Sequence, residues 1–308
     1  MSLLHTVVSI AVFCMYTVGG LTELLCTVSV VRHTEWSTKA GLVLIVSLAV
    51  VDLVAVVPAI VGSFCSVVSV DLGRLVYLIG FFNNVSWACN TLHLSLLAVN
   101  RFIAVVLYTL YSQVCTANNS VRAVALAWSF SVLYAILTAA VGYPVVWSER
   151  FVVTVFDYHR NATLPELPMT LTAALNLLTF SLPPLLYLAV FARLLVMRCA
   201  HANSDTDVSL CVQFLLITVV SVFTALSWNL LSLVGFQFWF LVSLLTALNF
   251  TVNGYVYLLF NETIRTAVKF LLQSLMAGKP TVGSLSGTNN THGQGQNGAA
   301  LRKKVTTF

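Results

Sequence analysis

Arg101 ends a long apolar stretch of the sequence, although arginine is an expensive residue in a membrane helix. A guanidinium stays protonated, and placing it at a bilayer centre costs roughly 2.5–3.5 kcal/mol. Arg101 follows Arg74 by about 27 residues, so a helix with ~20 spanning residues would carry it to the far interface. A permanent charge at the inner edge of a helix bundle suits a conformational switch. The charged side chain can bind one partner in the resting state of the bundle and a different partner in the active state.

Two carboxylates, Glu23 and Asp52, fall near the middle of other apolar stretches, where an unpaired charge is costly. Two nearby carboxylates resist double ionisation, so such a pair would share a proton or require a cation. The polar side chains at helical spacing that we expect near them are Asn90, Asn249, Asn253 and Tyr257. The sequence therefore predicts an intramembrane polar cluster that acts as a switch. The alternative is a polar knot that only packs helices, through bonds worth ~0.6–2 kcal/mol each.

The composition indicates which elements must position these residues. The chain is 59% hydrophobic and 8% charged, with a mean hydropathy of +0.93, and this excludes an ordinary soluble domain. Seven apolar stretches are long enough to span a bilayer: 3–31, 40–66, 75–99, 121–147, 168–196, 208–234 and 237–260. We predict an all-α membrane protein, a bundle of seven transmembrane helices.

The distribution of lysine and arginine predicts the orientation of this bundle. With Met1 outside, twelve of the fifteen basic residues lie on the inner side. The net charge of +5 is therefore an orientation signal and predicts no nucleic-acid partner. Asn161, in the long outer loop, begins an Asn-Ala-Thr glycosylation motif in the right compartment. That loop contains no cysteine, so we expect no external disulfide.

The last part of the chain differs in composition from the rest. Residues 278–300 are mostly Gly, Ser, Thr, Asn and Gln, which cannot bury a core and predict disorder. We therefore expect a seven-helix domain over 1–276, ending in a short cytosolic amphipathic helix, and a disordered cytosolic tail over 277–308. Basic residues of this region, Lys269 and Arg302 to Lys304, are candidates for contact with the lipid bilayer.

Motifs of enzymes and metal sites do not occur in the sequence. There is no HExxH, GxSxG, CxxC or phosphate loop, so we predict no catalytic residues and no metal site. His93, inside a span, is interpreted as a hydrogen-bonded packing residue. Instead of a signalling switch, the bundle could form a transporter or channel in which Glu23 and Asp52 relay protons or cations. Its helices would then be broken at Gly19-Gly20 and Pro183-Pro184. An odd number of spans and the lack of an inverted repeat argue against it.

Four segments resemble motifs of rhodopsin-like G-protein-coupled receptors. Leu48-Ala49-Val50-Val51-Asp52 resembles LAxxD, Asn100-Arg101-Phe102 with Tyr111 resembles DRYxAI…Y, Trp128 fits the fourth-helix tryptophan, and Asn253-Gly254-Tyr255-Val256-Tyr257 resembles NPxxY. Asparagine before the arginine and phenylalanine after it are similar to the nematode serpentine chemoreceptors. Gln213 suits class x of that group.

The sequence departs from the receptor pattern at several positions. Glu23 stands in place of the first-helix asparagine, Tyr108 in place of a loop proline, and Gly254 in place of the proline of NPxxY. No proline follows Trp228, and the cysteine at the top of the third helix is absent. We therefore expect neither the family's usual disulfide nor its sixth-helix kink.

The resemblance implies a chemosensory receptor at the plasma membrane, in sensory cilia, that signals through a heterotrimeric G protein. It assigns coupling and switching to Asn100, Arg101, Phe102, Tyr111, Asn253 and Tyr257. It also implies that Asp52, Asn90, Asn249 and Asn253 gather and can hold an allosteric sodium ion, with Glu23 beside them. Because Asn100 carries no charge, Asp205 and Asp207 are the candidates to restrain Arg101.

The outer halves of the helices offer amides and few charges to a ligand. The candidate pocket residues are Asn83, Asn84, Trp87, Asn176, Thr179, Trp228 and Asn229. Asn83 stands where amine receptors carry an acid, which argues against a cationic amine. Apolar walls with a few amide groups favour a neutral, partly apolar small molecule.

Overall fold

The computed structural model describes residues 3–156, 166–200, 205–234 and 238–276, without the side chains of residues 156, 197–200, 205–211 and 230–234. Seven of its helices are long and apolar enough to cross a membrane, which confirms the predicted all-α bundle. They are α1 (Leu3–His33), α2 (Ala40–Val68), α3 (Leu75–Val105), α5 (Ala117–Ala140), α6 (Glu166–Ala200), α7 (Asp205–Val234) and α8 (Trp239–Phe260). The predicted tail, 277–308, and Asn161 lie outside the described residues.

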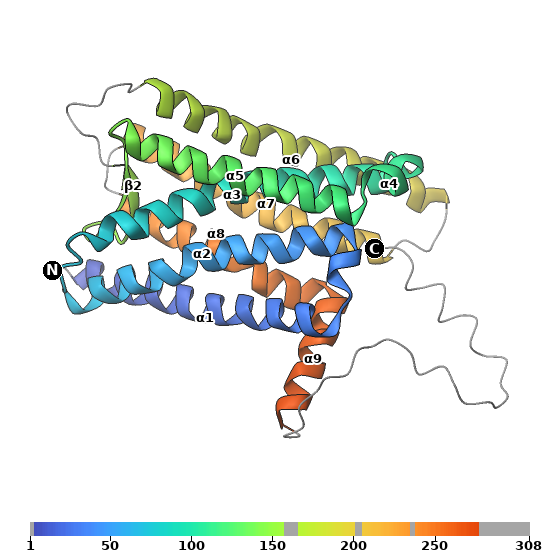
Figure 1. Ribbon diagram of the computed structural model, residues 1–308, viewed down its shortest axis with the longest axis horizontal. Helices are drawn as coiled ribbons and strands as arrows, with labels where there is room; N and C mark the ends of the chain where they lie inside the picture. Colours follow the sequence, from blue (N-terminus) through green and yellow to red (C-terminus); the bar gives the residue numbers. More distant parts are fainter. Residues whose placement is uncertain (1–2, 157–165, 201–204, 235–237, 277–308) are drawn as a thin grey trace.

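The seven helices run roughly side by side along the long axis of the molecule (Figure 1). Helix α3 contacts α2, α5, α6 and α7, so it occupies the centre of the bundle. Helix α1 packs against α2 and α8. The bundle has two distinct ends. We call the one with the N-terminus and the two strands the hairpin end, and the opposite one the α9 end (Figure 1).

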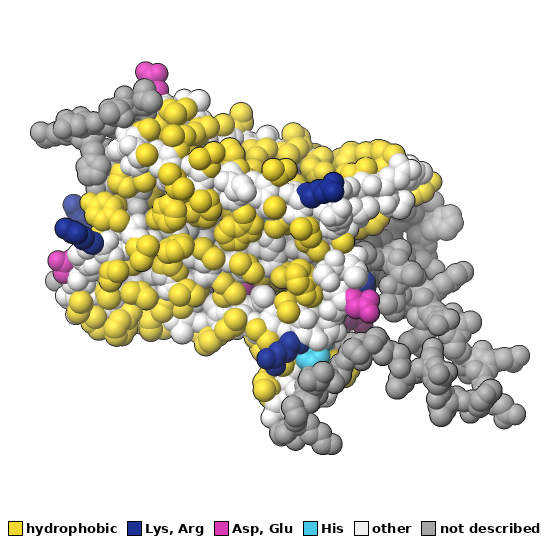
Figure 2. Space-filling model, in the orientation of Figure 1, with side chains coloured by type: hydrophobic (Ala, Val, Ile, Leu, Met, Phe, Trp, Pro, Cys, Tyr) yellow, Lys and Arg dark blue, Asp and Glu magenta, His cyan; other side chains and the backbone are white. Residues whose placement is uncertain are grey.

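The flank of the bundle is apolar. Figure 2 shows hydrophobic side chains over most of the visible flank, while Lys, Arg, Asp and Glu side chains lie mainly toward its two ends. Large apolar side chains face outward, for example Leu126 with 72% and Leu188 with 68% of its surface exposed. Lipid tails, and not water, are the solvent that matches such a surface.

The fourth predicted span, 121–147, is wrong at its end. Helix α5 begins earlier, at Ala117, where the Thr116 hydroxyl accepts a hydrogen bond from the Asn119 amide, and it ends at Ala140. Gly142 then adopts φ +89°, and Pro144 lacks an amide hydrogen for a further helical turn. The apolar residues that follow form a strand, because an apolar run does not by itself distinguish a strand from a helix.

Two short strands, β1 (Val145–Ser148) and β2 (Val153–Phe156), form an antiparallel hairpin over the hairpin end. The Trp147 side chain is 3% exposed and donates a hydrogen bond to the Ser66 hydroxyl of α2. At Gly80 of α3, a Cβ atom would lie 1.8 Å from the Val145 carbonyl oxygen, so only glycine lets the hairpin approach this closely. Non-covalent contacts therefore hold the hairpin onto the bundle.

Three shorter helices connect the spans at the α9 end or extend beyond it. They are η1 (Trp36–Thr38), α4 (Tyr108–Val114) and α9 (Glu262–Met276). Helix α9 leaves the bundle at an angle to α8 (Figure 1). Its buried side chains are Ile264, Ala267, Val268 and Leu271, so the predicted amphipathic helix is present.

The predicted helix breaks do not occur. Helix α1 continues through Gly19-Gly20, and Pro183 and Pro184 lie inside α6. Neighbouring helices can satisfy the backbone groups that proline releases, which is why proline is tolerated in membrane helices. The predicted packing role of His93 is confirmed, because its ring bonds to the Ser47 hydroxyl and to the Cys89 carbonyl.

Candidate functional site

The two intramembrane acids lie in the middle of the bundle and have no solvent exposure. Asp52, on α2, accepts a hydrogen bond from Asn90 Nδ2 of α3 at 3.1 Å and another from Asn253 Nδ2 of α8. Three helices are therefore joined at one carboxylate. The structure brings together the predicted positions of Asp52, Asn90 and Asn253.

Glu23, on α1, lies near this group but takes no part in its hydrogen bonds. Neither of its carboxylate oxygens has a hydrogen-bond partner among the described residues, although the Gly254 amide of α8 is close by. A Cβ atom at Gly254 would lie 2.6 Å from Glu23 Oε2. Glycine in place of the NPxxY proline thus leaves room for this side chain.

The acid pair presents free oxygen atoms in a buried site. Glu23 interacts electrostatically with Asp52, and the Asn253 Oδ1 atom beside them also lacks a described partner. Two carboxylates in such a site cannot both be ionised without a compensating charge. The free donors here are carboxylate and amide oxygens, a ligand type that suits hard cations.

Asn249 and Tyr257 share the predicted face of α8 with Asn253 and are likewise buried. Asn249, however, accepts a hydrogen bond from the Ser221 hydroxyl of α7 at 2.7 Å, and it forms no described bond to Asp52. The Tyr257 hydroxyl has no described partner. The face was predicted correctly, but Asn249 connects α8 to α7 and does not join the acid cluster directly.

Arg101 lies near the junction of α8 and α9, at the α9 end of the bundle, and is only 9% exposed. Its guanidinium carbon is 5.3 Å from the centre of the Phe214 ring on α7, a distance at which a cation and an aromatic face attract. Its Nε atom has no described partner, and neither does the Nδ2 atom of the adjacent Asn100. The side chains of Asp205 and Asp207, its predicted partners, lie outside the described residues.

Two other proposed coupling residues, Phe102 and Tyr111, lie on α3 next to Arg101 and on α4. Phe102 packs against Val190 and Leu194 of α6. Tyr111 lies on α4, where burial raises the pKa of its phenol and the positive charge of Arg101 partly opposes that rise. The same two causes act on the pKa of Cys115. The positive charge of Arg101 therefore affects the pKa of groups on α4 and directly after it.

A cavity of about 520 Å³ lies at the hairpin end. Its described lining residues are Tyr143, Pro168, Met169, Thr172, Ala173, Asn176, Leu177, Phe180 and Asn229. They come from the segment after α5, from α6 and from α7. No charged side chain is among them. Of the seven predicted pocket residues, only Asn176 and Asn229 line this cavity.

Four of the other five predicted pocket residues contact a neighbouring helix, and Asn83 bonds within its own helix. Asn84 donates to the Thr138 hydroxyl of α5, Thr179 donates to the Thr91 hydroxyl of α3, and Trp228 donates to the Thr246 hydroxyl of α8. Asn83 donates to the carbonyl oxygen of Ile79 in its own helix, and Trp87 packs against Tyr134. Buried polar groups are costly without partners, so these residues are used in packing.

Sequence reasoning missed Tyr143 and Thr172 as lining residues. Tyr143 lay inside the predicted fourth span, so its position at a helix end was not recognised. Thr172 is bonded to the Tyr134 hydroxyl at 2.7 Å. The feature of the sequence that could have indicated Thr172 is its four-residue spacing to Asn176, which places both side chains on one face of α6.

A family model for the serpentine type 7TM GPCR chemoreceptor Srt matches residues 5–279, which include all seven spanning helices and α9. No curated protein matches the chain significantly. The predicted resemblance to serpentine chemoreceptors is supported at the level of the receptor type, whereas class x is not confirmed.

Proposed function

Because the chain belongs to the serpentine 7TM GPCR chemoreceptor family Srt, we propose that it binds an external small molecule and activates a heterotrimeric G protein. One observation carries this proposal. An uncharged cavity at the hairpin end and a buried arginine without a described ion pair at the α9 end lie on one helix bundle. We place the hairpin end outside the plasma membrane and the α9 end in the cytosol, following the charge bias, and favour sensory cilia as the location.

The lining of the cavity favours a neutral ligand. Tyr143, Thr172, Asn176 and Asn229 can form hydrogen bonds, while proline, methionine, leucine and phenylalanine side chains supply apolar walls. A charged ligand would be desolvated there without a described counter-charge. A partly apolar molecule with one or two hydrogen-bonding groups fits this chemistry.

The cluster around Asp52 is the proposed link between the two ends. It ties α2, α3 and α8 together through one carboxylate, and Asn249 extends the connection to α7. A change in the packing of α6 or α7 around a ligand can alter these bonds. At the α9 end of α3, Arg101 would then move away from Phe214 and contact the G protein.

We also propose that the acid pair holds one sodium ion or one proton in the resting receptor. The residues present fit a cation, because Glu23 offers two free oxygens and Asn253 offers one, next to Asp52. Agonist potency measured at constant ionic strength, with sodium replaced by N-methylglucamine, tests this proposal. We expect sodium to lower potency in the native chain and to have a smaller effect in Glu23→Gln. Equal sodium sensitivity of both would contradict a role for Glu23.

Expression in cultured cells with reporters for several G-protein classes tests the main proposal. A screen of neutral volatile and water-soluble metabolites should give concentration-dependent signals. For an active compound, Asn176→Leu should reduce potency by about tenfold, because it removes a hydrogen bond from the cavity. Thr170→Val on the same helix is the control, because Thr170 does not line the cavity and bonds only to the Glu166 carbonyl.

The alternative of a transporter or channel predicts a different result in the same cells. Uptake of a substrate that depends on Glu23 and Asp52, without any change in G-protein signalling, would favour it. The family match favours the receptor, because Srt is a family of chemoreceptors.

A further inference from the structure

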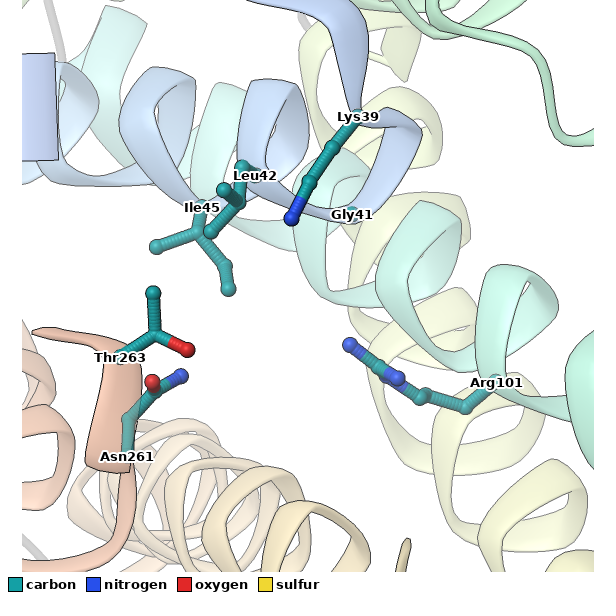
Figure 3. Close-up of a pocket in the computed structure, with 7 residues that line it drawn as sticks. All are labelled: Lys39, Gly41, Leu42, Ile45, Arg101, Asn261 and Thr263. Atoms are coloured by element: carbon teal, nitrogen blue, oxygen red, sulfur yellow. The ribbon is translucent and has the colours of Figure 1, made fainter. Parts of the chain in front are cut away.

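A second, much smaller cavity lies at the α9 end. Its described lining residues are Lys39, Gly41, Leu42, Ile45, Arg101, Asn261 and Thr263 (Figure 3). They come from the start of α2, from α3 and from the junction of α8 and α9. The cavity measures about 20 Å³. A space of this size admits about one oxygen-sized group.

The charged residues that are described in the lining of this cavity, Lys39 and Arg101, are both positive. In Figure 3, the Lys39 ammonium and the Arg101 guanidinium point into the same space, and the polar ends of Asn261 and Thr263 face it from across. Arg101 is nine-tenths buried, and its Nε atom has no described partner. No carboxylate is among the described lining residues. Two cations beside one small cavity repel each other unless an anion lies between them.

The backbone around the cavity adds to this positive potential. Helix α2 begins at Ala40, and the preceding Lys39 provides no side-chain cap. Helix α9 begins at Glu262, and Asn261 accepts a hydrogen bond from the Ile264 amide in its first turn. The amino-terminal ends of helices carry free N–H groups and partial positive charge, and they favour anions. Two such ends meet at this cavity.

Among the residues whose side chains are described, the nearest acids along the chain do not neutralise the cavity. Glu35 and Glu262 are exposed, and neither lines it. The amide of Asn100 brings no negative charge to Arg101. A water molecule would fill the space but would leave both cations uncompensated.

We propose that this cavity binds a phosphate group, with one oxygen inserted between Arg101 and Lys39 and the rest of the group at the rim. A guanidinium fork and a lysine are the side chains that phosphate recognition uses most. The oxygen replaces the carboxylate that the Asn100 position lacks. The phosphate can belong to a phospholipid headgroup or to a free anion, since the chemistry at the cavity is the same.

This phosphate would hold Arg101 against the first turn of α2. A Cβ atom at Gly41 would lie 3.4 Å from Arg101 Nη2, so the guanidinium already packs against that turn. A receptor with the phosphate bound would keep Arg101 away from the G protein and would signal less without ligand. This consequence rests on the proposed function, whereas the binding itself does not.

The binding test uses the full chain, purified and placed in nanodiscs of phosphatidylcholine. Dioctanoyl phosphatidylinositol bisphosphate and sodium phosphate are titrated separately, and binding is followed by the midpoint of thermal unfolding. At least one of the two should raise the midpoint of the native chain, and the arm that does so identifies the source. Lys39→Gln should weaken that binding about tenfold, the effect of losing one charge-assisted contact. Arg122→Gln, an exposed basic residue near the start of α5 that does not line the cavity, is the control and should leave it unchanged.

A second pair of variants tests the position of the anion. Gly41→Asp places a carboxylate beside Arg101 and should abolish phosphate binding without lowering the midpoint measured in the absence of phosphate. Gly41→Asn has the same shape without the charge and should still bind. No stabilisation of the native chain by either phosphate, or an equal loss in Lys39→Gln and Arg122→Gln, would overturn the proposal. Because no G protein is needed, these outcomes are independent of the proposed function.

Discussion

Among the residues with described side chains, Asp52 and Glu23 carry the two fully buried carboxylates, and their surroundings differ in a way that separates their roles. Asp52 accepts hydrogen bonds from Asn90 and Asn253, so its negative charge organises two donors. Glu23 has no described bond and relies on the space beside Gly254. Removing the charge at each position should therefore have different effects.

The first prediction compares Asp52→Asn with Glu23→Gln. The amide introduced by Asp52→Asn would turn one of its own donors toward an Asn90 or Asn253 donor, so the connection between α2, α3 and α8 weakens. We expect ligand-evoked signalling to fall about tenfold in Asp52→Asn, while surface expression stays within a few-fold. Glu23→Gln removes no described bond and should keep a larger share of the signal. Concentration–response curves normalised to surface labelling measure both, and an unchanged signal in Asp52→Asn would contradict the switch.

The second prediction concerns the close contact of Gly254 with Glu23. Gly254→Ala places a methyl group 2.6 Å from Glu23 Oε2, and overpacking of this kind costs about 1–3 kcal/mol. We expect a lower midpoint of thermal unfolding in detergent. Adding Glu23→Ala should recover part of the loss, because the obstructing carboxylate is then absent. Additive effects of the two substitutions would show that the contact is not responsible.

The third prediction concerns Arg101. Arg101→Ala should abolish G-protein activation and leave ligand binding intact, because the cavity for the ligand lies at the opposite end of the bundle. Asp205→Asn combined with Asp207→Asn should raise basal signalling only about two- to fivefold, since an exposed ion pair is worth ~0.2–1 kcal/mol. Ligand binding and G-protein activation are measured on the same membranes. Full signalling from Arg101→Ala would exclude the coupling role.

The hairpin and α9 are the elements whose packing most affects the two ends of the bundle. At the hairpin end, β1 and β2 are held by contacts from several helices, and the five cysteines with described side chains are free. The His5 ring bonds to the Glu149 carbonyl oxygen, and the Leu72 amide donates to the Glu149 carboxylate. The Ser243 hydroxyl donates to the Phe151 carbonyl oxygen. These bonds position the hairpin over the helices without a described covalent link.

The fourth prediction follows from the role of Trp147 in this attachment. Trp147→Ala removes a fully packed indole and its bond to Ser66, a change that costs about 3–5 kcal/mol in a core. We expect a lower unfolding midpoint and faster ligand dissociation, because the hairpin is held less firmly. Tyr77→Ala, on a side chain that is 46% exposed, is the control and should change neither. Slower or unchanged ligand release in Trp147→Ala would show that the hairpin does not help to retain the ligand.

At the scale of the whole molecule, charge and hydrophobicity divide the chain into an apolar flank and two unlike ends. The α9 end combines Lys39, Arg101 and the basic side chains of α9, such as Arg265 and Lys269. The hairpin end has Glu149 bonded to the bundle. Basic residues are retained on the cytosolic side of membrane proteins, so the α9 end is the expected inner side.

The fifth prediction tests this orientation. A tag added after Phe308 should be stained only after permeabilisation, because twelve of the fifteen basic residues lie on the predicted inner side. Digestion with a glycosidase should increase the mobility of the chain, and Asn161→Gln should remove that effect. Antibody staining of the tag in intact cells would reverse the orientation and with it the receptor hypothesis.

The sequence alone determined the features that depend on short stretches of the chain. Apolar length located seven spans, and the four-residue period located the buried face of α8. Composition predicted Asp52 and Glu23 as costly, and therefore meaningful, residues. These signals are local, so neighbouring helices do not alter them.

Only the tertiary structure decided which groups meet. The rotation of each helix about its axis determines which side chains meet. It lets Asn249 bond to Ser221 and not to Asp52. It also turns Asn84 and Thr179 toward neighbouring helices and away from the cavity. Strand β1 formed where the end of the predicted span 121–147 was expected to be helical, because pairing with β2 and burial of Trp147 outweigh the apolar run that precedes it. The convergence of Lys39 and Arg101 joins segments that are distant in the chain. Such contacts depend on packing across helices, which no local pattern records.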